Sequence, residues 1–116
     1  MVDDEPLVRR GIVAGVDWAA LGCEVVGEAQ SGEEGLELAR RLKPELIITD
    51  IRMPKMDGIE LVRTLREEKQ AVKVIFLTAY SDFSYAQQAV RLQASDYLLK
   101  PFEDGQLEAV VKKILG

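Results

Sequence analysis

The chain has 116 residues, of which 47% are hydrophobic and 30% are charged, and its formal net charge is −5. These values indicate one globular domain, and they exclude a disordered chain and, since no apolar run approaches ~20 residues, a membrane-spanning one. The sequence has no histidine, one cysteine (Cys23), no basic block and no recognisable signal peptide. It therefore excludes histidine-based catalysis and an internal disulfide, disfavours direct binding to nucleic acid or membrane, and predicts a cytoplasmic location.

The first half of the chain predicts two helices and two strands. In chain order they are a helix over 6–17, a strand over 23–29 centred on Val25 and Val26, a helix over 31–43 and a strand over 46–50. Ser31 and Glu34 form a capping box, in which each side chain can satisfy an orphan backbone N–H group, and Pro44 stops that helix. The strand over 46–50 is apolar until it ends on Thr49 and Asp50.

The second half continues the alternation. In chain order it predicts a helix capped by Asp57, a strand over 72–78, a helix from Asp82 or Ser84 to about Leu92, a strand over 97–99 and a last helix with an apolar stripe from Leu107 to Leu115. The strands are apolar along their length, as expected when helices cover both faces of a parallel sheet. The chain therefore predicts a doubly wound α/β fold.

Polar residues gather where these strands end. Asp3 and Asp4 follow Met1-Val2, and Asp50, Thr78 and Lys100 each follow a predicted strand. In doubly wound folds the site lies outside the carboxyl ends of the strands, so these residues are expected to meet there.

Three carboxylates at one edge require a cation, because two unit charges ~4 Å apart repel by roughly 1 to 4 kcal/mol at effective dielectrics of 80 to 20. Hard oxygen ligands without His or Cys suit Mg²⁺. An aspartate can also act as a nucleophile and become an aspartyl phosphate, with the metal and Lys100 offsetting the phosphoryl charge. The constellation indicates phosphoryl-transfer chemistry.

Four segments carry a family resemblance: VDDE (2–5), TDIRMPKMDG (49–58), LTAY (77–80) and DYLLKPF (96–102). In this order and spacing they resemble the receiver domain of bacterial two-component response regulators. The resemblance covers residues 1–116 as one receiver domain and implies the CheY-like, flavodoxin-like fold, a five-stranded parallel sheet in the order 2-1-3-4-5.

The resemblance also implies the site residues and their roles. Asp50 is expected to be the phosphoacceptor, assisted by the Thr78 hydroxyl and the Lys100 ammonium, with Thr78 and Tyr97 as switch residues. The implied metal, Mg²⁺ or Mn²⁺, is held by Asp3, Asp4, Asp50 and the backbone carbonyl of Arg52, with Asp3 acting through water. A cis peptide bond is expected between Lys100 and Pro101.

A narrower resemblance implies partners. Residues 17–39 and 79–101 are similar to receivers of the YesN type, which are commonly joined to an AraC-like helix-turn-helix output domain that this chain does not contain. The phosphoryl group is expected from a sensor histidine kinase, and phosphorylation is expected to promote a homodimer. DNA binding would then belong to the output domain.

Other interpretations compete with this one. Asp50 alone is compatible with a cap after a strand, Tyr97 with a core aromatic and Lys100 with a solvated lysine. An aspartyl-nucleophile phosphatase or phosphotransferase commonly carries a second acid two residues after the nucleophile. This chain has Arg52 at that position, which argues against such an enzyme. A metal-free interaction domain would not need the five site residues. We therefore expect a signalling domain that catalyses its own modification rather than a turnover enzyme.

The first strand is expected to be short or irregular. Only Met1 and Val2 precede Asp3, whereas the resemblance to receiver domains implies a central first strand of about five residues before the acidic pair. Losing two or three buried aliphatic side chains at roughly 1.5 to 3 kcal/mol each would remove much of the roughly 5 to 15 kcal/mol that stabilises a domain. Residues upstream of Met1 are expected to complete this strand.

Overall fold

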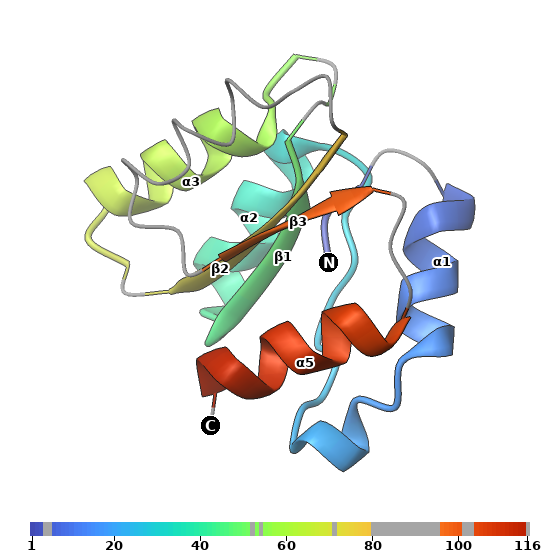
Figure 1. Cartoon of the computed structure of the whole chain (residues 1–116). Coiled ribbons are helices and arrows are strands. Elements are labelled where there is room, and N and C mark those ends of the chain that lie inside the picture. Colours follow the sequence, from blue (N-terminus) through green and yellow to red (C-terminus); the bar gives the residue numbers. More distant parts are fainter. Residues whose placement is uncertain are drawn as a thin grey trace.

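The computed structural model describes residues 1–3, 6–51, 53, 55–70, 72–79, 96–100 and 104–115, with only the backbone at 6–8, 78–79, 96–97, 99–100, 104 and 115 (Figure 1). The helices are α1 (Pro6–Gly15), α2 (Gly32–Leu42), α3 (Gly58–Glu67) and α5 (Asp104–Leu115), the strands are β1 (Leu46–Asp50), β2 (Lys73–Ala79) and β3 (Asp96–Lys100), and a 3-10 turn, η1 (Ala19–Leu21), follows α1. None of the helices in these ranges has the length and apolarity needed to cross a membrane. The helix predicted from Asp82 or Ser84 to Leu92 lies outside the described residues.

The strands form a parallel sheet in the order β1, β2, β3. On the other side of β1, Val2 makes isolated parallel bridges to both Thr49 and Ala29. The spatial order is therefore Ala29, Val2, β1, β2, β3, which confirms the predicted order 2-1-3-4-5 and its doubly wound topology.

Helices cover both faces of this sheet (Figure 1). On one face, α2 and α3 pack against β-strand residues that include Ile47 and Phe76. On the other face, α1 and α5 pack against residues that include Ile48 and Ile75. Successive strand residues point to opposite faces, so an unbroken apolar strand supplies both hydrophobic clusters. The unbroken apolar pattern was thus a correct indicator of the two helical layers.

Two predicted helix caps are present. The Ser31 hydroxyl accepts a hydrogen bond from the Glu34 amide at 3.1 Å at the start of α2. The Asp57 carboxylate accepts one from the Glu60 amide at 2.9 Å at the start of α3. Each cap satisfies a backbone donor that the helix itself leaves without a partner. Asp57 therefore acts as the helix cap that the sequence predicted.

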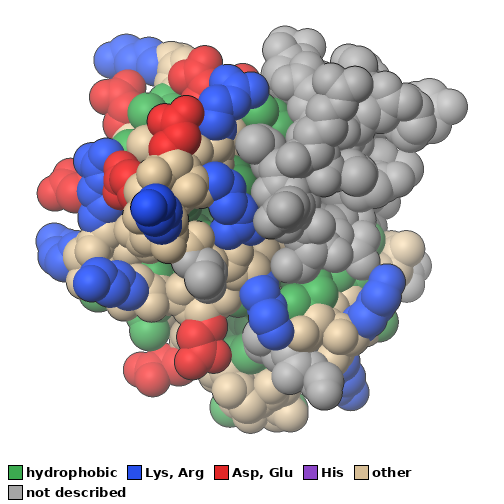
Figure 2. Space-filling model, turned by 90° about the vertical axis from the view of Figure 1, so that its left-hand side faces the viewer, with side chains coloured by type: hydrophobic (Ala, Val, Ile, Leu, Met, Phe, Trp, Pro, Cys, Tyr) green, Lys and Arg blue, Asp and Glu red, His purple; other side chains and the backbone are tan. Residues whose placement is uncertain are grey.

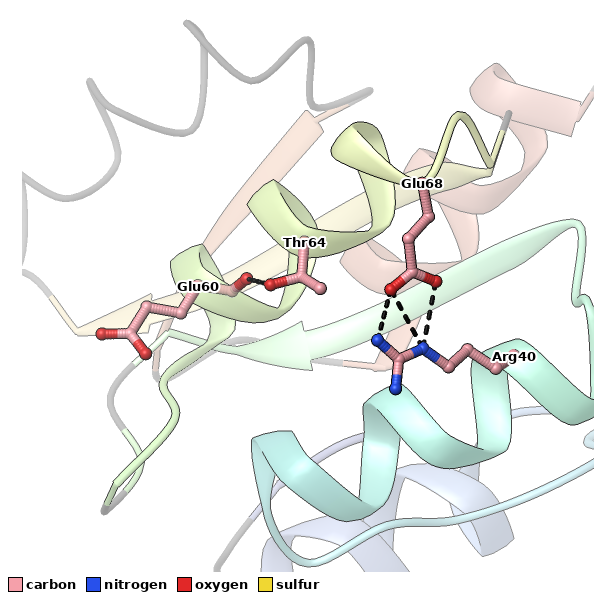
Figure 3. Close-up of polar contacts among 4 residues, drawn as sticks. All are labelled: Arg40, Glu60, Thr64 and Glu68. Carbon is pink, nitrogen blue, oxygen red and sulfur yellow. Dashed lines mark hydrogen bonds and ion pairs between the residues drawn. The ribbon is translucent and has the colours of Figure 1, made fainter.

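An ion pair links α2 to the end of α3 at the surface (Figure 3). The Arg40 Nε donates to both carboxylate oxygens of Glu68 at 3.0 Å, and Nη2 donates to Oε2 as well. This hydrogen bonding lowers the pKa of Glu68 and raises the pKa of Arg40. Both side chains face solvent, so the pair contributes little to stability.

The face of the molecule seen in Figure 2 carries charges of both signs, with acidic and basic side chains interspersed. The exposed charged residues of α2 and α3 show the same mixture: Glu33, Glu34, Glu37, Arg40, Arg41, Glu60, Arg63 and Glu67. Such a surface differs from the single-sign basic surface typical of nucleic-acid-binding domains.

The predicted strand over 23–29 was wrong for most of its length. Residues 23–28 have no regular secondary structure, and only Ala29 forms a bridge. Val25 and Val26, expected at the strand centre, are 36% and 54% exposed. A parallel strand exists only where a neighbour provides consecutive hydrogen-bonding partners. Among the described residues, only Val2 forms bridges both to Ala29 and to β1, as expected for a short first strand.

Candidate functional site

Asp50 is the last residue of β1 and is 6% exposed. Its amide donates to the carbonyl of Val2 at 2.8 Å, and its carbonyl accepts a hydrogen bond from the Thr49 hydroxyl at 2.9 Å. The residue after it, Ile51, donates its amide to the Leu77 carbonyl at 3.1 Å. The backbone that carries the Asp50 carboxylate is therefore held from both neighbouring strands.

Asp3 lies beside Asp50 at the same edge of the sheet. Val2 pairs with Thr49 in parallel. The next residue of each chain segment, Asp3 and Asp50, therefore lies beside the other where the two segments leave the sheet. Asp3 is fully buried, and its amide donates to the Ala29 carbonyl at 3.0 Å. Burial of two carboxylates at adjacent positions is unfavourable unless other groups compensate their charge. The structure thus brings together one acid of the predicted pair and the predicted phosphoacceptor.

Thr78 and Lys100 are at the same edge by their backbones. The register pairs Asp50 with Leu77, so Thr78 lies one residue beyond that pair, and Lys100 is opposite Ala79. Tyr97 pairs with Phe76 near the beginning of β3. The side chains of these three predicted residues are not among the described ones.

The predicted metal set is only partly within the described residues. Asp4 and Arg52 lie outside them, as does Pro101 of the predicted cis bond. Among the residues that the structure describes, no group of three potential metal ligands is found. Of the predicted carboxylate ligands, the structure brings together Asp3 and Asp50.

Arg9 is a neighbour of the site that the sequence reasoning missed. Its Nη1 donates to the Asp3 carbonyl at 2.7 Å, and its Nε lies 3.3 Å from the Glu28 Oε1. Arg9 therefore ties α1 to the loop that carries the acidic pair and to the segment before Ala29. The signal available in the sequence was a basic residue on the helix that begins just after two acids.

Two glycines allow close approaches of the backbone, and one of them, Gly58, lies at the site. A Cβ atom added to Gly58 would lie 2.2 Å from the Asp50 carbonyl oxygen, and one added to Gly32 would lie 2.1 Å from the Met56 carbonyl oxygen. Each is the first residue of its helix, after the caps Asp57 and Ser31. Only glycine allows the start of α3 to approach Asp50 so closely. The sequence signal for such a close approach is a helix-capping residue followed directly by glycine, as in Ser31-Gly32 and Asp57-Gly58.

Comparison with known proteins identifies relatives over the whole chain. The family model described as response regulator receiver domain matches residues 1–112. The chain is 33% identical over 116 residues to the uncharacterized transcriptional regulatory protein YesN of Bacillus subtilis, covering 100% of this chain and 32% of YesN. It is 34% identical over 113 residues to the transcriptional regulatory protein HptR of Staphylococcus aureus, covering 97% of this chain and 44% of HptR. The chain thus spans less than half the length of either relative.

Solved structures show the same similarity. The REC domain of AraT, a response regulator from Geobacillus stearothermophilus, is 46% identical with a TM-score of 0.91, over 97% of this chain and 88% of that one. A two component transcriptional regulator AraC from Clostridium phytofermentans is 35% identical with a TM-score of 0.89, over 98% of this chain and 88% of that one. The match to the family model, over residues 1–112, includes both Asp3 and Asp50.

Proposed function

Since the chain belongs to the family of response regulator receiver domains of two-component systems, we propose that Asp50 accepts a phosphoryl group from the phosphohistidine of a sensor kinase. The observation that carries this proposal is the pair of buried carboxylates, Asp3 and Asp50, at neighbouring positions on the carboxyl edge of the sheet. A buried acid pair is suited to binding a cation and a phosphoryl group rather than to packing.

The donor set fits a magnesium or manganese ion. Asp3 and Asp50 are buried, hard oxygen donors, and the chain offers no histidine as a competing ligand. We assign Asp4 and the backbone carbonyl of Arg52 to the same set. When bound, the ion offsets the negative charge of the phosphoryl oxygens.

In the proposed reaction a carboxylate oxygen of Asp50 attacks the phosphorus. The bond from phosphorus to the histidine nitrogen breaks, and that nitrogen keeps the electron pair. Because the other ring nitrogen of the phosphohistidine carries a proton, the histidine leaves as a neutral imidazole, and the second product is an aspartyl phosphate. The Lys100 ammonium pairs with the phosphoryl oxygens, and the Thr78 hydroxyl donates a hydrogen bond to one of them. The hydrogen bonds that fix the Asp50 backbone support this role, because in-line transfer depends on a nucleophile held in position.

Phosphorylation then changes the surface that the domain presents. In this proposal Thr78 moves toward the phosphoryl group and Tyr97 turns inward, which shifts a pre-existing equilibrium between two states. The domain acts in the cytoplasm as a switch and modifies itself without turning over a substrate. The names of the relatives YesN and HptR as transcriptional regulatory proteins support an output domain, for which we propose an AraC-like helix-turn-helix that binds DNA. Dimerisation on phosphorylation belongs to the same proposal.

Intact mass measured after incubation with Mg²⁺ and a small phosphodonor tests the assignment. The parent chain should gain one phosphoryl group, and Asp50→Asn should gain none. Asp57→Asn is the matched control, because asparagine also caps helices and this variant should be labelled like the parent. Labelling of Asp50→Asn to the parental extent would refute the assignment. Failure of the parent to be labelled would favour an interaction domain, and continuous consumption of the donor would favour an enzyme.

A further inference from the structure

The backbone of Asp3 is held through both its N–H and its C=O group. The amide donates a hydrogen bond to the Ala29 carbonyl at 3.0 Å, and the carbonyl accepts one from the Arg9 Nη1 at 2.7 Å. The first bond ties Asp3 to the segment that ends at Ala29, and the second ties it to α1. Since Asp3 is fully buried, the direction in which its carboxylate leaves the chain depends on how these two bonds fix its backbone.

Arg9 is in turn oriented by Glu28. The Arg9 Nε donates to the Glu28 Oε1 at 3.3 Å, and the Arg9 side chain is 13% exposed. A guanidinium is planar, and its N–H groups point in fixed directions within that plane. An acceptor at Nε therefore sets the plane in which Nη1 reaches the Asp3 carbonyl. Glu28 thus acts on the backbone of Asp3 through Arg9.

The charge of Arg9 opposes a metal ion at this edge of the sheet. A guanidinium beside the Asp3 carbonyl repels a cation bound between Asp3 and Asp50. An arginine that served only to compensate these two carboxylates would therefore compete with the metal for them. An arginine whose hydrogen bond holds Asp3 in the direction that the metal requires would instead strengthen metal binding. The two roles predict effects of opposite sign when Arg9 is removed.

We propose that Glu28 and Arg9 form a positioning pair for the cation site, in which Glu28 orients the guanidinium and Arg9 fixes the carbonyl of Asp3. This inference rests on the proposed function, because the pair serves the metal ion of that same site. Both are positioning residues, since in this role neither contacts the metal or the phosphoryl group. Their loss weakens metal binding and leaves the transfer step itself unchanged once the metal is bound.

The test measures the Kd for Mn²⁺ from the electron paramagnetic resonance signal of the free ion, with no phosphodonor present. Glu28→Ala removes the acceptor at Nε and should raise this Kd about two- to fourfold. Glu24→Ala is the matched control, because it removes the same side chain from another exposed position of the segment 23–28. Its Kd should equal that of the parent. Equal Kd values for Glu28→Ala and Glu24→Ala would overturn the proposal.

Two further variants separate the hydrogen bond from the charge. Glu28→Gln loses the charge but keeps an oxygen that can accept from Nε, so its Kd should stay close to that of the parent. Arg9→Met should bind Mn²⁺ more weakly than the parent. Tighter binding by Arg9→Met would overturn the proposal, because that sign belongs to an arginine that only compensates the carboxylates.

A double-mutant cycle connects Glu28 to Arg9. In the Arg9→Met background no guanidinium remains to be oriented, so Glu28→Ala should leave the Kd for Mn²⁺ unchanged there. Effects of the two substitutions that multiply would mean that they act separately, and would overturn the pair. The cycle is unaffected by a general loss of stability, provided that circular dichroism shows each variant folded at the temperature of the titration.

Phosphorylation at varied Mg²⁺ concentration separates the pair from the chemistry. In Glu28→Ala the Mg²⁺ concentration that gives half the maximal rate should rise by the same factor as the Kd, while the rate at saturating Mg²⁺ should equal that of the parent. A lower saturating rate with unchanged half-saturation would overturn the positioning role. If the parent bound no Mn²⁺, the proposed metal site would fail and the pair with it. A parent that binds Mn²⁺, with Glu28→Ala and Arg9→Met binding it equally well, would overturn the pair alone.

Discussion

Replacing Gly58 by alanine should destabilise the fold and displace the candidate phosphoacceptor. The added Cβ would lie 2.2 Å from the Asp50 carbonyl oxygen and 3.1 Å from its carbonyl carbon, whereas Cβ atoms essentially never approach closer than 3.0 Å. The obstructing atoms belong to the backbone at the end of β1, so no side-chain rotation relieves the contact. Either α3 or the end of β1 must move by about 0.8 Å, because the 2.2 Å contact with the Asp50 carbonyl oxygen is that much shorter than the 3.0 Å limit.

The magnitude follows from two opposing terms. Overpacking of this kind costs about 1 to 3 kcal/mol, and alanine regains about 0.5 to 1 kcal/mol because glycine is unfavourable within a helix. The net loss is about 1 to 2 kcal/mol. With an unfolding entropy of about 2.1 cal/mol/K per residue, this corresponds to a decrease in Tm of roughly 4 to 8 °C for a chain of this length.

The assay is thermal unfolding followed by circular dichroism, with the rate of Asp50 phosphorylation measured by intact mass. Gly11→Ala is the matched control, because Gly11 lies within α1 and an added Cβ would meet nothing within 4 Å. That control should be stabilised by about 0.5 to 1 kcal/mol and phosphorylated at the parental rate. If Gly58→Ala were as stable as Gly11→Ala and equally reactive, the close approach of α3 to Asp50 would not constrain the site.

Two further predictions concern charged side chains. Arg9→Met removes the donor to the Asp3 carbonyl and should weaken Mg²⁺ binding several-fold in a titration, with Arg9→Lys intermediate. The control Arg10→Met, at an exposed position, should bind Mg²⁺ as the parent does. If Arg9→Met and the parent bound Mg²⁺ equally tightly, Arg9 would have no role at the site. Glu68→Gln should lower Tm slightly at pH 7. The hydrogen bond from Arg40 lowers the pKa of Glu68 in the folded chain, so the ion pair stabilises the folded chain at any pH above the ordinary pKa of glutamate. That contribution disappears as the pH falls through the lowered pKa of Glu68 in the folded chain, so the two Tm values should converge in acid. A Tm difference that stays constant as the pH is lowered would contradict the ion-pair explanation.

The sequence by itself determined the features that depend on local signals. The alternation of helices and strands followed from apolar runs and helical periodicity. The structure confirms it for α1, α2, β1, α3, β2, β3 and α5, but not for the predicted strand over 23–29. The caps at Ser31 and Asp57 depend on residues within one turn of each other, so their hydrogen bonds could be predicted from spacing alone. Asp50 was placed at the sheet edge by the end of its apolar run. The order of the strands, in contrast, came from the resemblance, because local pattern does not specify which strands are neighbours.

Only the tertiary structure decided the features that need a partner distant in the chain. Val25 and Val26 have the composition of a strand but are irregular and exposed, because a strand requires consecutive backbone partners and the bridge formed by Val2 on this side reaches only Ala29. The contact of Arg9 with Asp3 depends on where α1 packs, and the need for glycine at position 58 depends on how closely α3 approaches β1. These distances arise when separate elements pack together, and neither composition nor periodicity within one element contains them.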